Sequence, residues 1–382
     1  MNTIASIRSE IDAIDDQIVD LYTRRLAASA RIAEAKKGSG APIFAPARER
    51  EIVTRLAEKA GPEMASDVAY LYDTVFAVSR ARQRVLLGGD APLCAEIRSA
   101  AASTPAAFPE MATVACQGAD GAYSQQALSS IFRIPNILFF NSFEDVFNAV
   151  EKGMCRYGIL PVENSLAGSV TAVYDLMVRH HFRIVRAFRQ KIAHALLAPK
   201  GVALADIREV VSHSQALSQC SDFLNAHKAI KPTSASNTAV AAREVAASPR
   251  RDLAVIASRA CAELYGLSVV EGNVSNTPHN FTRFICISKD LEIYPDARKI
   301  SIMMSLPHRP GSLSNILSRF SSVGVNLTKL ESRPVPGMDF EFMFTFDFEA
   351  DPMSPSVQSL LAELSTDPEI ERFTFLGAYA EH

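Results

Sequence analysis

The opening segment, from about Thr3 to Lys37, has the pattern of one long amphipathic helix. At about 1.5 Å per residue, this helix would be about 50 Å long. Its apolar positions recur at a heptad-like spacing and form one continuous stripe. They are Ile4, Ile7, Ile11, Ile14, Ile18, Leu21, Ala28, Ile32 and Ala35. Because the rest of the helical segment is too short to cover such a stripe, we expect a second copy of the chain to cover it.

The N-terminal quarter of the chain predicts an all-α module. Residues 1–88 have no strand-like run, and the helical pattern breaks only at GSGAP and GPEM. Residues 89–111 are rich in Gly, Ala, Ser and Pro and have no sustained apolar period. We therefore expect a linker there.

The remainder of the chain has a sequence pattern typical of mixed α and β structure. In residues 112–288, short β-type runs such as ATVAC, NILFF and DLAVIA alternate with helical stretches, which is typical of α/β layers. A second set of such units begins near His194, so we expect two lobes with a cleft between them. Residues 299–379 predict the order strand, helix, strand, strand, helix, strand, an α+β ferredoxin-like βαββαβ unit. The fold class is thus multi-domain.

Bulk composition excludes several classes of protein. With 382 residues, 48% hydrophobic residues and a net charge of -3, the chain predicts several ordinary globular cores and no nucleic-acid partner. The six cysteines are scattered without a CxxC pair, which favours reduced thiols.

The charged N-terminus lacks a signal peptide's apolar core, and no run has the length of a membrane span, so we expect a cytoplasmic protein.

Polar side chains occupy apolar positions in the helical module. Arg25 lies where the step from Leu21 to Ala28 requires an apolar residue. A buried guanidinium needs an anion. Lys36, eleven residues later, lies within about 20° of Arg25 around the helix, so the two cations share a face. Arg8 lies about 100° away and suits a partner's pocket better.

The shorter helices repeat this anomaly. Glu49, next to Arg48, aligns with the inward Ile52 and Leu56, and Ser79 and Gln83 are one turn apart on another inward stripe. Three cations, a carboxylate and two neutral hydrogen-bonding groups suit a small anion with ether or hydroxyl oxygens. The alternative is a polar dimer interface in which Arg25 and Lys36 pair with nearby acids.

The segments IRSEID, DDQIVDLYTRRLAASARIAEAKK, APIFAPARERE and SRARQ together resemble the all-helical chorismate mutases, which are intertwined dimers. The resemblance implies a role for seven side chains. The carboxylates of chorismate would contact Arg25, Ser79 and the partner subunit's Arg8, the ether oxygen would face Lys36 and Gln83, and the hydroxyl-bearing side of the ring would face Arg48 and Glu49. Many members have an acid where this chain has Ala45, so we expect a weaker hydroxyl contact and a raised KM.

A chorismate mutase needs no nucleophile, metal or cofactor, because its reaction is a unimolecular rearrangement. It needs a clamped reactive conformer and stabilisation of charge at the breaking C–O bond. We expect no cofactor and no metal in this chain.

Three polar segments occur in the α/β region, at or near strand ends. PVENSLAGS places Glu163, Asn164 and Ser165 at a strand's carboxyl end, where α/β proteins bind ligands. VSHSQAL places Gln215 at a strand-to-helix junction with Ser214 as a plausible N-cap. HNFTRFICIS places Thr282 and Arg283 within an apolar strand, and GADGAYS is a small-residue loop before a helix. Helix capping and a salt bridge explain each segment alone equally well.

In this order, GADGAYS, PVENSLAGSV, SHSQAL, ELYGL and NFTRF are similar to prephenate dehydratases over the whole region. The resemblance implies that Thr282 assists departure of the ring hydroxyl. It implies a substrate-binding cleft lined by Glu163, Asn164, Ser165, Gln215, Thr238 and Arg283. Ser214 stands where the family usually has proline.

Two C-terminal segments, PHRPGSLSNIL and LESRP, resemble the ACT-type amino-acid sensor attached to prephenate dehydratases, although a turn with a capping serine also explains them. The resemblance implies phenylalanine binding across a dimer interface at Gly311, Ser312, Leu313, Glu331, Ser332 and Arg333. Feedback inhibition would then follow by population shift.

The whole chain therefore resembles a bifunctional chorismate mutase/prephenate dehydratase of phenylalanine biosynthesis with a regulatory ACT domain. Its expected partners are chorismate, prephenate, phenylalanine and further copies of itself in a homodimer or higher oligomer, with no membrane or nucleic acid. Two alternatives stay open. The same architecture can act as an arogenate dehydratase, or it can be a non-catalytic amino-acid-sensing binding protein.

Overall fold

The computed structural model describes residues 3–36, 45–87, 91–334 and 342–382. The chain forms two compact units. The first comprises Met1–Arg98 and Met303–Phe373, and the second comprises Ser99–Ile302 and Thr374–His382. Within the described residues, no helix is both long enough and apolar enough to span a membrane.

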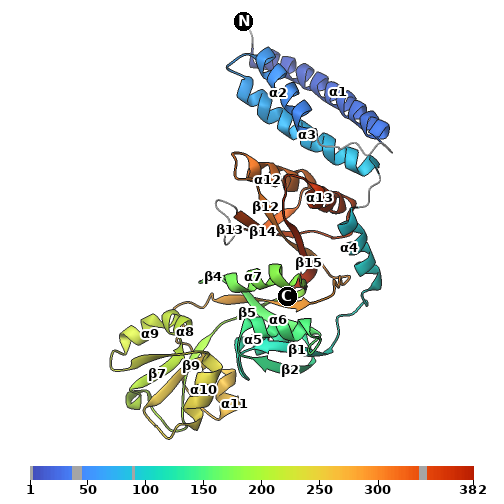
Figure 1. The fold of residues 1–382 in the computed structure, drawn as a ribbon. Coiled ribbons are helices and arrows are strands. Elements are labelled where there is room, and N and C mark those ends of the chain that lie inside the picture. Colours follow the sequence, from blue (N-terminus) through green and yellow to red (C-terminus); the bar gives the residue numbers. More distant parts are fainter. Residues whose placement is uncertain (1–2, 37–44, 88–90, 335–341) are drawn as a thin grey trace. The chain divides into compact units, whose positions relative to one another are not determined.

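The first unit begins with three helices, α1 (Ile4–Lys36), α2 (Pro46–Ala60) and α3 (Ala65–Leu87), as the sequence predicts (Figure 1). The predicted break at GPEM is confirmed: Gly61 adopts a φ of 82° and its N–H donates to the carbonyl of Ala57 at 3.1 Å. The break predicted at GSGAP lies outside the described residues. Helix α3 packs against both α1 and α2 and buries Phe76.

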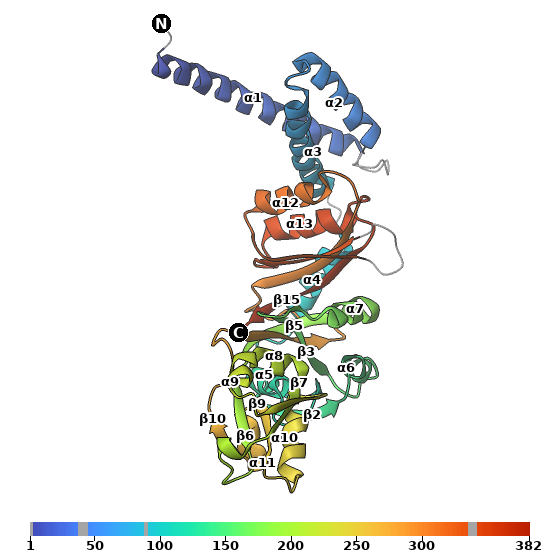
Figure 2. The ribbon, with the colours of Figure 1, turned by 90° about the vertical axis from the view of Figure 1, so that its left-hand side faces the viewer.

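The N-terminal half of α1 extends beyond α2 and α3 (Figure 2). Its apolar stripe is therefore exposed in a single chain: Ile4 is 72% exposed, Ile18 57% and Leu21 61%. Apolar side chains in such a long row favour burial against another surface. The second copy that would cover the stripe stays a prediction.

The segment predicted as a linker contains a helix that the sequence analysis did not predict. Helix α4 (Pro92–Ser103) buries Cys94, Ile97 and Ala100, and Ala91 directly before it is also buried. These side chains are three residues apart and so lie near one helix face, but they are too small or too few to give a conspicuous apolar period. The Cys94 thiol donates to the carbonyl of Gln358, which anchors the helix within the first unit.

The C-terminal part has the predicted βαββαβ order: β12 (Lys299–Leu306), α12 (Ser312–Val323), β13 (Asn326–Pro334), β14 (Phe342–Glu349), α13 (Pro355–Thr366) and β15 (Phe373–Glu381). In the first unit, the strand order is β13-β14-β12, and α12 and α13 lie together on one face of these strands (Figure 2). Phe320, Phe346 and Phe348 fill the core beneath them. Strands β12 and β15 contribute residues to both units.

The first lobe of the second unit is built on a mixed sheet of order β15-β5-β11-β3-β1-β2. Its strands besides β15 are β1 (Met111–Gln117), β2 (Ile134–Phe140), β3 (Tyr157–Asn164), β5 (Arg183–Lys191) and β11 (Phe281–Ser288), with the short β4 (Gly168–Ser169) paired to β3. Helices α5 (Tyr123–Ile131), α6 (Phe143–Glu151) and α7 (Thr171–His180) pack on it.

The second lobe begins at His194, as predicted. Its five-stranded sheet has the order β10-β6-β9-β7-β8, with β6 (His194–Ala198), β7 (Glu209–His213), β8 (Lys231–Ala235), β9 (Leu253–Ser258) and β10 (Ser268–Glu271). Its helices are the 3-10 turn η1 (Leu204–Asp206), α8 (Ser214–Gln219), α9 (Ser221–Ala226), α10 (Thr238–Ala247) and α11 (Ala260–Tyr265). Two apolar clusters form its core.

The chain crosses between the two lobes twice, from β5 to β6 and from β10 to β11. The two crossings are tied together because the N–H of Ile192 donates to the carbonyl of Asn280 at 2.8 Å. Ligand sites commonly lie where two lobes meet.

Candidate active sites

Helices α1 and α3 bring three of the predicted mutase residues together. The Arg25 Nη1 donates to the Ser79 Oγ at 2.7 Å, and the guanidinium lies 5.3 Å from the ring centre of Phe76. One turn along, the Gln83 Nε2 donates to the Ser29 Oγ at 2.5 Å. Ser79 and Gln83 are both buried.

Two features of this cluster favour the binding of a ligand. Among the described residues, no carboxylate pairs with the Arg25 guanidinium, whose contacts are a hydroxyl and the rings of Tyr72 and Phe76. The Gln83 Oε1 is buried and has no hydrogen-bond partner within the described part of the chain. A half-buried cation next to an incompletely bonded amide is costly unless an anionic, hydrogen-bonding ligand completes it.

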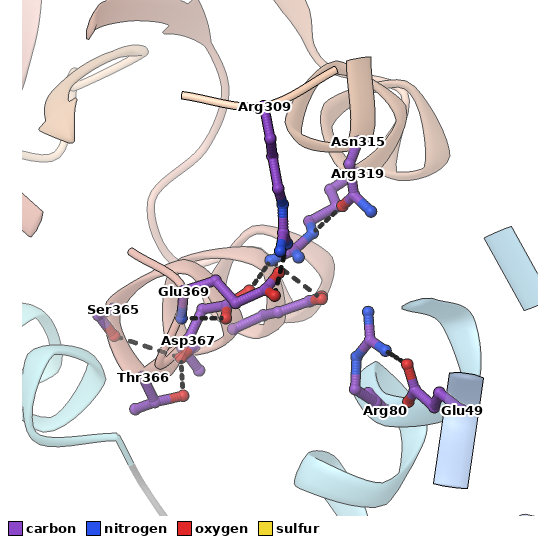
Figure 3. Close-up of polar contacts among 11 residues, drawn as sticks. Glu49, Arg80, Arg309, Asn315, Arg319, Ser365, Thr366, Asp367 and Glu369 are labelled. Carbon is purple, nitrogen blue, oxygen red and sulfur yellow. Dashed lines mark hydrogen bonds and ion pairs between the residues drawn. The ribbon is translucent and has the colours of Figure 1, made fainter. Parts of the chain in front are cut away.

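Helix α2 places Glu49 in an ion pair that the sequence analysis did not anticipate. The Arg80 Nη1 lies 2.5 Å from the Glu49 Oε2 (Figure 3). Their side chains are only 10% and 22% exposed, so the pair is shielded from solvent. Arg80 directly follows Ser79 in SRARQ, but only the packing of α2 on α3 shows that it meets Glu49.

The other three predicted mutase residues lie on α1 and α2. Arg48 pairs with Glu51 at 2.5 Å on the exposed face of α2, and Arg8 is exposed on the projecting half of α1. Lys36 is half-buried and forms the last residue of α1. Arg8 was expected to serve a neighbouring chain, and its exposure is compatible with that expectation.

Thr282 and Asn164 lie at the centre of the second site. They are directly opposite each other in the register of β11 and β3, and the Asn164 Nδ2 donates to the Thr282 Oγ1 at 2.9 Å. The same nitrogen donates to the Asn280 Oδ1 at 2.8 Å. Thr282 is 8% exposed. Its hydroxyl oxygen accepts a hydrogen bond, and the described residues offer its hydrogen no acceptor.

Glu163 and Arg283 lie on the opposite face of the sheet from this pair, contrary to their predicted place in the cleft. They are register partners one residue away from Asn164 and Thr282, and successive strand residues point to opposite faces. The Arg283 Nε lies 2.6 Å from the Glu381 Oε1, and its Nη2 donates to the Tyr379 Oη at 2.6 Å. The alternation along the strand already indicated this separation.

The remaining predicted dehydratase residues are dispersed. The Ser165 Oγ accepts the N–H of Phe281 at 3.0 Å and so ties the end of β3 to the start of β11. Thr238 is half-buried at the first residue of α10, directly after its N-cap Asn237. Gln215 is exposed on α8. The N-cap of α8 is His213 rather than Ser214, because the His213 Nδ1 accepts the N–H of Gln215 at 3.2 Å.

The GADGAYS loop packs against the second lobe. The Ser258 Oγ donates to the carbonyl of Gly121 at 2.9 Å, and the Tyr265 Oη donates to the carbonyl of Asp120 at 2.7 Å. Gly121 has a φ of +85°, and a Cβ there would lie 2.8 Å from the Cys261 Sγ. Only glycine fits this close approach.

Gln219 and Asn280 are site residues that the sequence analysis missed. The Asn280 Nδ2 donates to the Gln219 Oε1 at 2.9 Å, which links the second lobe to the Asn164 and Thr282 pair. The SHSQAL segment directed attention to Gln215, four residues earlier. Only the fold identifies the helix face that turns toward Asn280.

In the C-terminal module, the two predicted sensor segments lie at element ends. Gly311 caps α12 with a φ of 85° and Leu313 is half-buried. The Ser312 Oγ is buried without a partner within the described residues. Glu331, Ser332 and Arg333 end β13, an edge strand of this part of the sheet. Nearby ion pairs, Arg319 with Asp367 at 2.6 Å and Arg309 with Glu369 at 2.5 Å, hold α12 and its loop to the end of α13 (Figure 3).

Residues 7–84 match the type II chorismate mutase family, and residues 114–292 match the prephenate dehydratase family. The chain is 35% identical over 278 residues to arogenate dehydratase/prephenate dehydratase 2 of Arabidopsis thaliana, covering 70% of this chain and 72% of that protein.

Two solved structures share the fold of about 70% of the chain. One is titled GqqA, a novel type of quorum quenching acylase, with 30% identity, a TM-score of 0.64 and coverage of 71% of this chain and 98% of that one. The other is a prephenate dehydratase from Arthrobacter aurescens in complex with L-Phe, with 29% identity, a TM-score of 0.63 and coverage of 70% and 89%.

The full-length match is the most informative. The bifunctional chorismate mutase/prephenate dehydratase of Escherichia coli K12 is 30% identical over 387 residues, covering 99% of this chain and 96% of that protein. Together with the two family matches, this places both enzymatic modules in one chain in the same order. The chain belongs to the bifunctional chorismate mutase/prephenate dehydratase family.

Proposed function

We propose that this chain rearranges chorismate to prephenate in its helical module and converts prephenate to phenylpyruvate in the cleft of its two-lobed module. The observation that carries the first activity is the Arg25 guanidinium, which the described residues supply with no anion. A carboxylate of chorismate is the anion that completes this site.

In the mutase site, Arg25 and Ser79 bind one carboxylate, and Arg8 of the partner subunit binds the other. Gln83 and Lys36 stabilise the ether oxygen as its C–O bond breaks. The Gln83 amide can do so after rotating by half a turn, because its carbonyl then accepts from the Ser29 hydroxyl and its NH2 is free to donate. Such donors act where charge develops in the transition state.

Glu49 accepts the hydrogen bond of the substrate hydroxyl, and Arg80 holds Glu49 in place. A shielded ion pair fixes both the charge and the rotamer of the carboxylate. Glu49 has to make this contact without help from position 45, because Ala45, directly before α2, has no carboxylate to offer the substrate hydroxyl. Arg48 orients the same side of the ring.

In the dehydratase site, prephenate loses water and carbon dioxide, and the electrons of the breaking C–C bond form the aromatic ring as hydroxide leaves. Because Asn164 occupies a lone pair of the Thr282 oxygen, the Thr282 hydroxyl hydrogen is available to the leaving hydroxyl. Thr238 and Ser165 contact the dicarboxylate. Glu163 and Arg283 hold the strand from its far face.

We further propose that the C-terminal βαββαβ module is an ACT domain that binds phenylalanine. Support comes from the buried, unpartnered Ser312 hydroxyl among the described residues and from the related dehydratase solved with L-Phe. The proposed ligand contacts are Gly311, Ser312, Leu313, Glu331, Ser332 and Arg333. The exposed stripe of α1 supports a homodimer in which the helical modules interlock.

The test is to assay purified full-length protein for each half-reaction, with prephenate and arogenate offered separately. The account expects turnover of chorismate and a higher kcat/KM for prephenate than for arogenate. A higher kcat/KM for arogenate establishes the rival substrate, and no turnover of any of the three substrates leaves only a binding protein. Phenylalanine is expected to inhibit the dehydratase step.

A further inference from the structure

A chain of hydrogen-bonded side chains runs from the centre of the dehydratase site into the second lobe and back to the first. Its members come from five elements and one interlobe crossing, and in order they are Thr282, Asn164, Asn280, Gln219, His194 and Tyr123. Thr282, Asn164, Asn280 and His194 are all buried, so their polar groups need hydrogen-bond partners.

The direction of this hydrogen-bond chain is fixed at Asn164. The backbone N–H groups of Leu166 and Ala167 donate to the Asn164 Oδ1 at 3.1 and 3.0 Å. A backbone N–H can only donate, so the amide of Asn164 cannot be flipped. Its Nδ2 therefore donates to Thr282 at 2.9 Å and to Asn280 at 2.8 Å.

The same reasoning fixes the next three groups. Because the Asn280 Oδ1 accepts from Asn164, its Nδ2 is the group that donates to the Gln219 Oε1 at 2.9 Å. The Gln219 Oε1 lies 3.1 Å from the His194 Nε2. An amide oxygen only accepts, so the His194 Nε2 must hold a hydrogen. His194 is thus a donor to Gln219 in either protonation state.

Tyr123 terminates the chain on the other side of the imidazole. Its Oη donates to the carbonyl of Ala193 at 2.7 Å and lies 3.2 Å from the His194 Nδ1. Burial lowers the pKa of His194 below its usual 6.5, although the bond to Gln219 opposes this effect. The Tyr123 hydroxyl has a single hydrogen, so in the neutral imidazole with its hydrogen on Nε2 this hydroxyl hydrogen is shared between the carbonyl of Ala193 and the His194 Nδ1.

We propose that His194, oriented by Tyr123, is a positioning residue of the dehydratase site. It donates to Gln219 and so completes the hydrogen-bond chain that keeps Asn164 directed at the Thr282 oxygen and the Thr282 hydroxyl directed at the leaving group. His194 touches no reacting atom. This inference rests on the proposed dehydratase function of Thr282.

The test compares two substitutions of His194 in the full-length protein. His194→Leu keeps the approximate volume but removes the donor, and His194→Gln keeps a donor on a side chain of similar length. We expect H194L to lower the dehydratase kcat about 10-fold while KM for prephenate changes less than about threefold. We expect H194Q to recover most of the lost kcat. Chorismate mutase activity of the same samples is expected to stay unchanged.

Two controls make the result specific. His227 is a half-buried histidine of the same lobe that directly follows α9, and its Nδ1 bonds the carbonyl of Phe223 in that helix, so H227L is expected to leave the dehydratase kcat unchanged. Full dehydratase activity in H194L, or equal losses in H194L and H194Q, overturns the positioning role. Failure of the proposed function itself is distinguishable, because the unmutated protein would then not dehydrate prephenate.

Discussion

At the scale of the residue, polar groups without a matching partner are the most informative features of this chain. Arg25 is a cation in an apolar stripe, and the described residues give it a hydroxyl and two aromatic rings instead of a carboxylate. Its misplacement is visible in the sequence because the helical period is regular. By contrast, Arg80 and Gln219 acquire their partners only when separate elements pack together, and no local pattern marks them.

The Arg80 and Glu49 pair gives a prediction for the mutase. Arg80→Ala removes the group that fixes the Glu49 carboxylate, so we expect the mutase kcat/KM to fall about 10-fold, with partial recovery in Arg80→Lys. Initial rates of chorismate consumption measure this. Arg82→Ala, an exposed position on the same helix, is the matched control. Unchanged mutase activity in R80A would show that Glu49 does not depend on Arg80.

The cluster around Glu381 predicts an acid-sensitive contribution to stability. Burial alone would raise the pKa of Glu381, but the charges of Arg283 and Lys299 outweigh burial and hold the pKa below its usual 4.5. A carboxyl group with a depressed folded-state pKa stabilises the protein above the unfolded pKa, and this stabilisation is lost as the pH falls through the folded pKa.

We therefore expect Glu381→Gln to lower the thermal unfolding midpoint at pH 7. The difference from the unmutated protein should shrink as the pH falls below about 4.5. Thermal denaturation followed by circular dichroism between pH 3 and pH 7 measures both effects. A difference that stays constant over this range would mean that the charge of Glu381 contributes nothing.

At the scale of the element, regular patterns predicted most of the fold. The six strand and helix segments of the C-terminal module were predictable because strands alternate and helices have a 3.6-residue period. Helix α4 was not, because its buried face is made mainly of small side chains in an Ala-rich segment that also reads as a linker. Likewise, the sequence indicated polar strand ends, but only strand pairing showed that Asn164 opposes Thr282 while Glu163 and Arg283 face away.

The loop containing Gly121 gives a prediction at this scale. Gly121→Ala would place a Cβ 2.8 Å from the Cys261 Sγ at a φ of +85°. We expect a loss of about 1–3 kcal/mol of stability and reduced dehydratase activity, because the loop contacts both lobes. Gly153→Ala has a similar φ of +71° but meets nothing within 4 Å, so it isolates backbone strain from the clash. Equal effects of the two substitutions would exclude the clash as the cause.

Helix α1 predicts that two copies share each mutase site. If Arg8 serves the partner's pocket, then R8A and K36A are each inactive alone, but a mixed dimer contains one intact site. Unfolding and refolding the two variants together is expected to restore about a quarter of the normal mutase activity, since about half of the dimers are mixed and each has one working site. No recovery would mean that Arg8 and Lys36 of one chain serve the same site, or that Arg8 lies outside the site.

At the scale of the whole molecule, the two proposed sites belong to separate modules of one chain. The proposed mutase residues Arg25, Ser79 and Gln83 belong to the first compact unit, and the proposed dehydratase residues Asn164 and Thr282 belong to the second. The order of the modules was predictable from the helical and strand-like patterns along the sequence. The tertiary grouping was not, because the C-terminal strands β12 and β15 contribute to both units.

The central claim is therefore tested by measuring both half-reactions in two variants of the full-length protein. Lys36→Ala is expected to abolish chorismate rearrangement and leave prephenate dehydration intact, and Thr282→Ala is expected to do the reverse. Loss of both activities in both variants would contradict separate sites.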